Sequence, residues 1–415
     1  MISRFMRALG AASLAAMVGL APAALAAEPI RLAYVDPLSG TFAQQGDASL
    51  KMFSYVLSRL NARGGALGRT FELVPYDSKL QPAEALIALK SITDQNISFL
   101  MHCAGSNVAA ALIDGVAKHN ARNPNNRVLY LNCGALASDL TNENCDFWHF
   151  RFDGNTGMRA ASLVRALPKE ITSVYLLDQD YLFGQTLHRE TKEWLARLRP
   201  DVKIVGDEFI PLGKVKDFSS YAAKIKASEA QALITGNWGP DLNLLLKSTV
   251  EAGLDIKFYT YLAHVVGAVT AVGPTAENRL HSVMEFHPNV PGEGKNAEAE
   301  AFVAEWRKMH DFDLFQANVV TMLDMLAAAI TKAGGIDPYK VALALEDIRM
   351  NDLMGTENIM RKEDHQMVEP FYVARLVRNA RYDTEKTGLG WQTQLRADAS
   401  ELMQPTTCKM KRPAQ

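Results

Sequence analysis

The sequence has few cysteines and almost no excess charge. Its 415 residues include four cysteines, and 44 basic residues nearly balance 46 acidic ones. Four cysteines are too few for a small fold built on disulfides, and a near-neutral chain provides no broad positive surface for nucleic acid. Because 48% of the residues are hydrophobic, a disordered chain is excluded as well. The length predicts two or three domains, each able to bury its own core.

Catalytic and metal-binding motifs are also missing. The sequence has no Gly-x-Ser-x-Gly elbow, no His-Glu-x-x-His, no Cys-x-x-Cys and no Walker lysine loop. Residues 64–68 are glycine-rich, but they follow a helical pattern and lack the dinucleotide spacing, so we interpret them as a turn. His281 and His287 are the closest of nine histidines, and their six-residue spacing is weak evidence for a metal site. We therefore expect a protein that is not an enzyme and holds no cofactor or metal.

A long hydrophobic run occurs only near the N-terminus. Two arginines precede the apolar residues 8–20, and residues 24–26 fit a small-x-small cleavage site. The run is shorter than the roughly 20 residues that a membrane-spanning helix needs. We therefore predict a cleavable secretory signal at residues 1–26. No cysteine precedes Cys103, so we expect an exported, periplasmic protein without a lipid anchor.

The rest of the chain alternates strand-like and helix-like segments. Apolar runs typical of buried strands lie at residues 30–35, 71–76, 97–102, 127–132, 174–178, 202–210, 232–235 and 258–262. Helical patterns between them lie at residues 50–60, 82–93, 107–119, 185–198, 221–226 and 242–252. Repeated βα units predict parallel sheets with helices on both faces. An extended segment at residues 149–153 separates the two series, so we expect two doubly wound lobes.

Beyond residue 279 the pattern changes. A short extended run at residues 283–286 precedes helical patterns at residues 297–309, 316–333 and 339–348. A strand-like run follows at residues 371–376, and the remaining residues 381–415 form a polar tail.

Several short motifs occur in a recognisable order along the chain. Residues 30–40 form a strand that ends in Pro-Leu-Ser-Gly, residues 61–69 contain Asn-x-x-Gly-Gly-x-x-Gly, and further landmarks lie at residues 76–78, 217–219 and 251–254. Together these motifs resemble the leucine/isoleucine/valine-binding class of type I periplasmic solute-binding proteins of ABC transporters. The resemblance extends over residues 28–378.

The resemblance implies two α/β lobes joined by three crossing strands. The first lobe would comprise residues 27–150 and 281–358, the second lobe residues 151–280 and 359–380, with residues 381–415 as a C-terminal tail. In open α/β sheets, ligands bind beyond the carboxyl ends of the strands, and helix N-termini at that edge attract anions. The cleft between the lobes is therefore the expected ligand site.

The resemblance also implies a function. The protein would bind a small carboxylate-bearing ligand in the cleft, close its lobes over it, and deliver it to an ABC permease in the inner membrane. We expect a monomer that binds no nucleic acid. One alternative is a ligand sensor on the same fold that acts on a regulator, and a less favoured one is an exported enzyme on a doubly wound fold.

Two first-lobe loops correspond to the family's ligand loops. In the first loop, the Ser106 hydroxyl and nearby N–H groups would hold the ligand carboxylate, although Ser106 also suits a simple helix cap. In the second loop, a leucine replaces the family threonine, so backbone groups would serve instead. The residues expected to contact ligand here are Gly105, Ser106, Asn107, Gly134, Ala135 and Leu136.

The second lobe would supply an aromatic wall. By the resemblance, Tyr181, Phe183, Asn237 and Trp238 follow strands at the cleft, and packing within the lobe is the alternative role for the aromatic residues. Phe42, in the first turn of the first lobe, would add another wall.

One departure from the family concerns the ligand amine. The amino-acid binders place an acidic residue after the next strand, but residues 261–265 contain no carboxylate. By the resemblance, His264 is the residue expected to contact the ligand in this segment. A buried ammonium group without a counter-charge is costly. We therefore expect a carboxylate with an apolar or aromatic body rather than a plain α-amino acid.

The cysteines divide into two pairs by their surroundings. Cys145 lies in a polar loop and Cys408 in the polar tail, and we predict a disulfide between them because it would fasten the tail. Cys103 and Cys133 each follow an apolar strand run near the cleft. Parallel neighbouring strands can bring such residues together, but disulfide geometry is demanding, and the state of this pair stays open.

Overall fold

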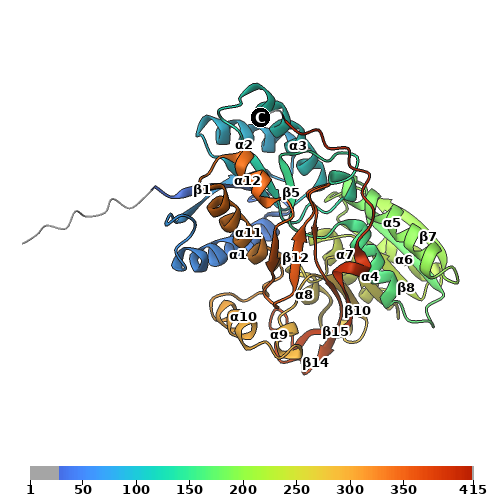
Figure 1. The fold of residues 1–415 in the computed structure, drawn as a ribbon. Coiled ribbons are helices and arrows are strands. Elements are labelled where there is room, and N and C mark those ends of the chain that lie inside the picture. Colours follow the sequence, from blue (N-terminus) through green and yellow to red (C-terminus); the bar gives the residue numbers. More distant parts are fainter. Residues whose placement is uncertain (1–27, 414–415) are drawn as a thin grey trace, which may run out of the picture.

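The computed structural model describes residues 28–413. The predicted signal at residues 1–26 lies outside these described residues. Two α/β lobes lie beside each other, with the blue N-terminal segments in one lobe and the green middle segments in the other (Figure 1). The fold therefore has the predicted pair of α/β lobes.

The first lobe is built on a five-stranded parallel sheet. Its strand order is β2-β1-β3-β4-β5. The strands are β1 (Ile30–Asp36), β2 (Phe71–Asp77), β3 (Phe99–His102), β4 (Leu129–Asn132) and β5 (His149–Arg151). The helices of this part are α1 (Ala43–Ala62), α2 (Pro82–Asp94), α3 (Ser106–Arg122), α10 (Ala297–Met309), α11 (Asn318–Ala333) and α12 (Pro338–Leu345), with the short 3-10 helix η1 (Ser138–Leu140).

The central strands of the first sheet are covered on both faces. Every residue of β3 and β4 is buried, as is all of β1 except Arg31. A parallel sheet covered by helices on both faces reads as continuous apolar runs, which is why these strands could be predicted. Helix α1 ends at the turn Gly64-Gly65, where both residues have positive φ. Gly65 also packs so closely that a Cβ there would lie 2.0 Å from the Arg69 carbonyl oxygen.

The second lobe is built on a seven-stranded mixed sheet. Its strand order is β15-β14-β10-β9-β8-β6-β7. The five strands from β10 to β7 are parallel, β14 is antiparallel to β10, and β15 is antiparallel to β14. The strands are β6 (Ser173–Gln179), β7 (Lys203–Ile210), β8 (Ala232–Thr235), β9 (Lys257–Thr260), β10 (Leu280–Met284), β14 (Phe371–Arg378) and β15 (Leu389–Ala397).

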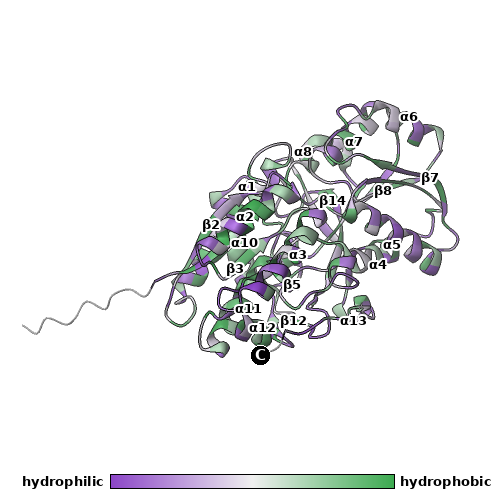
Figure 2. Ribbon diagram, turned by 90° about the horizontal axis from the view of Figure 1, so that it is seen from above, coloured by the Kyte–Doolittle hydropathy of each residue, from purple (hydrophilic) through white to green (hydrophobic). Residues whose placement is uncertain are grey.

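Helices of different character surround the second sheet. They are α4 (Thr156–Ala166), α5 (Leu182–Leu198), α6 (Ser219–Ala227), α7 (Gly239–Glu251), α8 (Ala268–Val272) and the short α13 (Ala399–Leu402), with the 3-10 helix η2 (Gly273–Ala276). Helix α4 is buried along most of its length, whereas α5 exposes a hydrophilic face that Figure 2 shows in purple. Helix α4 therefore belongs to the core of the lobe and α5 to its surface.

Three crossings join the two sheets. The chain leaves the first sheet after β5, returns after β10 through α9 (Val290–Glu293), and crosses again between β13 and β14. A small antiparallel sheet precedes the last crossing, formed by β11 (Arg349–Asn351), β12 (Glu357–Met360) and β13 (Met367–Val368). Each lobe is therefore discontinuous in sequence, as expected.

Two expected boundaries are wrong. The first segment of the second lobe, residues 151–280, is predicted to end at residue 280, but β10 continues to Met284 and pairs with β9 and β14. The polar tail was expected from residue 381, but it contains strand β15, which pairs with β14 along eight positions. Strand β15 escaped prediction because alternate residues of its second half face solvent, so it has too few apolar side chains to form an apolar run.

The last residues of the tail return to the first lobe. Thr407 N–H donates to Asn142 Oδ1 over 3.2 Å, and Arg412 Nη1 lies 2.5 Å from Glu346 Oε1. Cys408 forms a disulfide with Cys145, with the Cα atoms 5.7 Å apart. This pairing is the one that the sequence predicted.

Candidate functional site

A small cavity lies between the lobes at the carboxyl ends of the strands. Its volume is about 80 Å³, and residues that follow β1, β3, β4, β6, β8, β9 and β10 contribute to its walls. The lining residues are Asp36, Gln45, Gly46, Ser49, Cys103, Ala104, Gly105, Ser106, Gly134, Leu136, Asp153, Arg159, Tyr181, Phe183, Trp238, Leu262, His264, Val265, Glu285, Phe315 and Gln316. Both sheets thus present to one cavity the edge at which α/β proteins bind ligands.

The start of α3 forms one wall of the cavity. Gly105 precedes the helix with a φ of +92°, a conformation that glycine adopts without strain. The Ser106 hydroxyl oxygen accepts a hydrogen bond from the Ala137 N–H over 3.2 Å, so its own hydrogen is available for donation. The first N–H groups of a helix lack intrahelical acceptors and lie at its positive end. This wall therefore has the donors that a carboxylate requires.

Asp36, the last residue of β1, holds the loop that connects β3 to α3. Its Oδ1 accepts hydrogen bonds from the N–H groups of Cys103 (3.2 Å) and Ala104 (2.8 Å). Its Oδ2 is buried and has no hydrogen-bond partner among the described residues. Burial raises the pKa of Asp36 to about 6, and burial lowers the pKa of the nearby His102 to about 3, so His102 is neutral there. Asp36 thus lacks a positively charged neighbour on this side.

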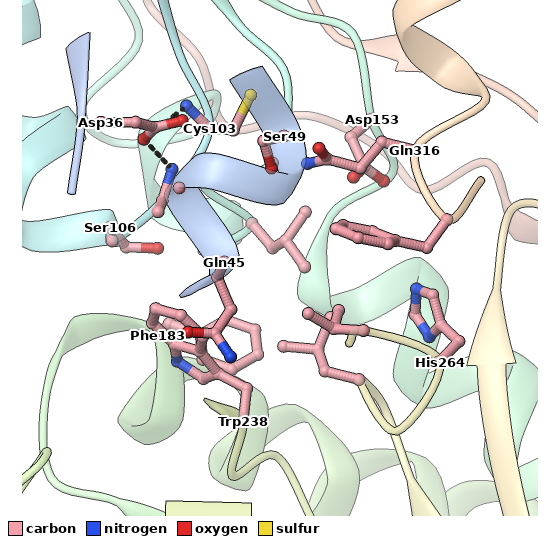
Figure 3. Close-up of a pocket in the computed structure, with 18 of the residues that line it drawn as sticks. Asp36, Gln45, Ser49, Cys103, Ser106, Asp153, Phe183, Trp238, His264 and Gln316 are labelled. Carbon is pink, nitrogen blue, oxygen red and sulfur yellow. Dashed lines mark hydrogen bonds between the residues drawn. The ribbon is translucent and has the colours of Figure 1, made fainter. Parts of the chain in front are cut away.

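The second lobe contributes an aromatic wall. The Trp238 indole N–H donates to the Tyr181 hydroxyl over 2.8 Å, and the Tyr181 and Phe183 rings lie 5.9 Å apart between centroids. Figure 3 shows Phe183 and Trp238 along one side of the cavity, and Asp36, Ser49 and Asp153 along the other. The cavity therefore has a polar side and an aromatic side.

Charged residues meet at the hinge end of the cavity. Arg159 Nη2 lies 2.7 Å from Asp153 Oδ1 and 3.0 Å from Glu285 Oε2, and all three side chains are buried. A third carboxylate, Glu369, accepts a hydrogen bond from the Gly154 N–H over 2.9 Å. Asp153, Glu285 and Glu369 each lie on a different crossing between the lobes. Burial raises the pKa of Glu285 to about 7.

Direct contacts hold the lobes together around the cavity. The Leu182 N–H of α5 donates to Asn107 Oδ1 of α3 over 3.1 Å, and Arg189 Nη2 lies 3.0 Å from Asp139 Oδ1. Ser138 Oγ of the first lobe donates to the Glu190 carboxylate of the second. The lobes are therefore closed over the cavity in this structure.

Many of the predicted site residues line the cavity, but not all of them do. Those that line it are Gly105, Ser106, Gly134, Leu136, Tyr181, Phe183, Trp238 and His264. Four others lie elsewhere, and each has a local reason. Phe42 packs behind the cavity on Trp238, with ring centroids 4.5 Å apart. Asn107 contacts the second lobe instead, and the backbones of Ala135 and Asn237 bond to Asn132 Oδ1 and Thr235 Oγ1.

Sequence reasoning missed most of the polar lining. The missed polar side chains are Asp36, Gln45, Ser49, Asp153, Arg159, Glu285 and Gln316. Asp36 carried a usable signal because it directly follows the first predicted strand. Asp153 and Glu285 carried none, since their segments meet only through the crossings. Both residues bring carboxylates to the cavity from outside residues 261–265, and both pair with Arg159. The expectation against an ammonium-bearing ligand therefore stays a prediction.

The state of the second cysteine pair is settled by the fold. Cys103 and Cys133 form a disulfide with a Cα–Cα distance of 4.6 Å, immediately after the paired ends of β3 and β4.

Over residues 28–413, no three His, Cys, Asp or Glu side chains are grouped to hold a metal ion. In that same part of the chain, no single helix combines the length and apolar composition needed to cross a bilayer.

Comparison with known proteins agrees with the fold. The family profile described as periplasmic binding protein matches residues 29–381. The Leu/Ile/Val-binding protein homolog 4 of Brucella abortus (strain 2308) is 30% identical over 420 residues, which cover 99% of each chain. The closed conformation of the leucine-, isoleucine-, valine-, threonine-, and alanine-binding protein from Brucella ovis is 30% identical, with a TM-score of 0.83 over 93% of this chain and all of that one.

A more distant solved structure shares the fold alone. It is the solute binding protein of an ABC transporter from R. palustris in complex with benzoate, which is 18% identical with a TM-score of 0.75. It covers 92% of this chain and 99% of its own. With the profile match and the full-length Brucella relative, the chain belongs to the periplasmic binding protein family.

Proposed function

We propose that this protein is the periplasmic substrate-binding component of an ABC uptake system and binds a small carboxylate between its lobes. The proposal rests on the hydrogen-bond donors that the start of α3 presents to the cavity. Ser106 is 1% exposed, lines the cavity, and has a hydroxyl hydrogen free to donate. The positive end of the helix adds an electrostatic attraction for an anion.

The body of the ligand would lie against the aromatic wall. Tyr181, Phe183 and Trp238 suit an apolar or aromatic group, because burying such a group against rings removes apolar surface from water. The names of the compared proteins include both branched-chain amino acids and benzoate. We therefore propose an acid with a compact apolar body, either amino-acid-like or aromatic.

A thermal-shift panel of acids and their matched amides tests this proposal. The panel contains L-leucine, L-alanine, benzoate and 4-hydroxybenzoate, with L-leucinamide and benzamide as partners that lack the carboxylate. A ligand that binds only the folded state raises the melting temperature with concentration. We expect at least one acid to do so and its amide to have little effect. No shift with any acid, or equal shifts with acid and amide, would contradict the proposal.

Delivery to a permease needs a test in cells. Deletion of the gene should abolish high-affinity uptake of the radiolabelled acid that binds the purified protein, and the gene supplied in trans should restore it. A strain that keeps normal uptake but loses a transcriptional response to the acid would instead indicate a sensor on the same fold.

A further inference from the structure

The two ligand loops of the first lobe begin where two paired strands end. Strands β3 and β4 pair in parallel up to His102 and Asn132, and Cys103 and Cys133 follow directly. Beyond that pair, the first loop leads to Ser106 at the start of α3 and the second leads to Gly134 and Leu136. All three of these residues line the cavity.

A covalent bond joins the loops at this point. The Cys103–Cys133 disulfide links residues 30 positions apart, and both cysteines are buried. The two backbones pack tightly next to the disulfide: a Cβ on Gly134 would lie 3.0 Å from the Cys103 carbonyl oxygen. Further along, the Ala137 N–H to Ser106 Oγ hydrogen bond also connects the two loops. The spacing between the two loops therefore depends on contacts at their roots.

Each loop is also fastened on its outer side, independently of the disulfide. Asp36 accepts hydrogen bonds from the N–H groups of Cys103 and Ala104. Asn318 Nδ2 donates to the carbonyl oxygens of Cys133 and Phe152, both over 2.9 Å. These contacts would keep the lobe folded without the disulfide, but none of them fixes the distance from one loop to the other.

We propose that the Cys103–Cys133 disulfide is a positioning element of the ligand site, which holds the two first-lobe loops at the spacing needed to bind the ligand carboxylate. The affinity part of this inference rests on the proposed function, whereas the positioning of the loops does not. The disulfide reduces the freedom of Gly105 and Gly134, whose backbones are otherwise permissive. A site held in its bound geometry loses less conformational entropy on binding.

The second disulfide of the chain provides a matched control. Cys145–Cys408 joins the tail to a loop outside the cavity lining and closes a much longer stretch of chain, because its cysteines are 263 positions apart. In the chain-entropy account, a longer closed loop stabilises the folded state at least as much as a shorter one. The two bonds should therefore differ in their effects on binding, not merely on stability.

The test compares the double variants Cys103→Ala/Cys133→Ala and Cys145→Ala/Cys408→Ala in the mature chain. Hydrogen–deuterium exchange requires no ligand, and we expect peptides covering residues 103–108 and 133–138 to exchange about tenfold faster in the first variant only. For whichever of the probes L-leucine and benzoate binds the wild type, we expect affinity to fall tenfold or more in the first variant and less than twofold in the second.

Three results would overturn the inference. They are unchanged exchange in both loops of the first variant, equal losses of affinity in the two variants, or a first variant that no longer folds by circular dichroism. A first variant that does not fold would mean that the Cys103–Cys133 disulfide is needed for the stability of the whole fold. If no acid of the thermal-shift panel binds the wild type but the loops exchange faster, the proposed ligand class fails while the positioning of the loops stands.

Discussion

The two walls of the cavity offer a ligand different parts of the chain. The first-lobe wall presents the start of α3, glycine backbone and the Ser106 hydroxyl, beside the polar side chains of Asp36, Gln45 and Ser49. The second-lobe wall presents the aromatic side chains of Tyr181, Phe183 and Trp238. Backbone donors are fixed by the fold, so they suit a group that every ligand shares. Aromatic side chains can change without altering the fold, so they suit selection among ligand bodies. We infer that the first lobe provides affinity for the acid and the second lobe provides specificity.

The largest predicted effect lies where the walls meet at the hinge. Arg159→Met removes the buried cation that pairs with Asp153 and Glu285 and leaves their charges uncompensated. We expect the free energy of unfolding at pH 7.5 to fall by about 3–5 kcal/mol, measured by urea denaturation. Arg165→Met on the exposed side of the same helix is the control and should change it by less than about 1 kcal/mol. Equal effects would show that the hinge cluster has no special structural role.

The next effect concerns the polar wall and pH. The pKa of Asp36 is raised by burial from 3.8 to about 6, so the folded state binds this proton more tightly than the unfolded state. The resulting stabilisation is complete only well below pH 3.8 and is lost as the pH rises through about 6. Asp36→Asn should remove this loss. The free energy of unfolding of the variant, relative to that of the wild type, should therefore rise by about 2.5 kcal/mol between pH 4 and pH 7.

Thermal unfolding of both proteins across that pH range measures the Asp36 effect. The asparagine keeps an oxygen for the N–H groups of Cys103 and Ala104, so the loop should retain its position. Parallel stability curves for the two proteins would mean that Asp36 has an ordinary pKa despite its burial.

The aromatic wall gives the next prediction. Trp238→Ala should weaken binding of benzoate by about 2 kcal/mol, or roughly 30-fold, while L-alanine loses little because its body is too small to reach the rings. Isothermal titration calorimetry measures both affinities, and Trp194→Ala on α5, outside the cavity lining, is the control. A similar loss for both ligands would mean that the aromatic wall does not select the ligand body.

The smallest predicted effect belongs to the first-lobe wall. Ser106→Ala removes one hydroxyl donor but keeps the helix start, so affinity for every acid that binds should fall by about 1.5 kcal/mol, or roughly tenfold. Ser162→Ala, whose hydroxyl bonds to Met158 within α4, is the control. If the loss is confined to one ligand body, Ser106 would contribute to specificity, and the division between the walls would fail.

The central strands of both sheets could be predicted from the sequence because most of their residues are buried on both faces. The apolar run at residues 30–35 corresponds to β1, and the one at residues 371–376 lies within β14. Strand β15 is half exposed, so no apolar run marked it. Helix α4 had no predicted counterpart because Arg159, buried within it, interrupts its apolar pattern.

A residue of the candidate site could be predicted only where its own strand and loop place it in the cavity. Ser106 begins α3 after a three-residue loop that follows β3, so its place at the edge of the sheet could be inferred from the pattern alone. Asn107 is the next residue, but its side chain contacts Leu182 of the other lobe, and lobe closure decides that contact. Glu285 meets Arg159 across 126 positions of the chain, a separation that local patterns do not span.

A crystal structure with the bound acid tests the central claim most directly. For whichever acid raises the melting temperature, we predict carboxylate oxygens within about 2.7–3.2 Å of Ser106 Oγ and of N–H groups at the start of α3, with the ligand body against Trp238. The contradicting result is a carboxylate bound to the Arg159 guanidinium at the hinge, with Ser106 making no contact to the ligand.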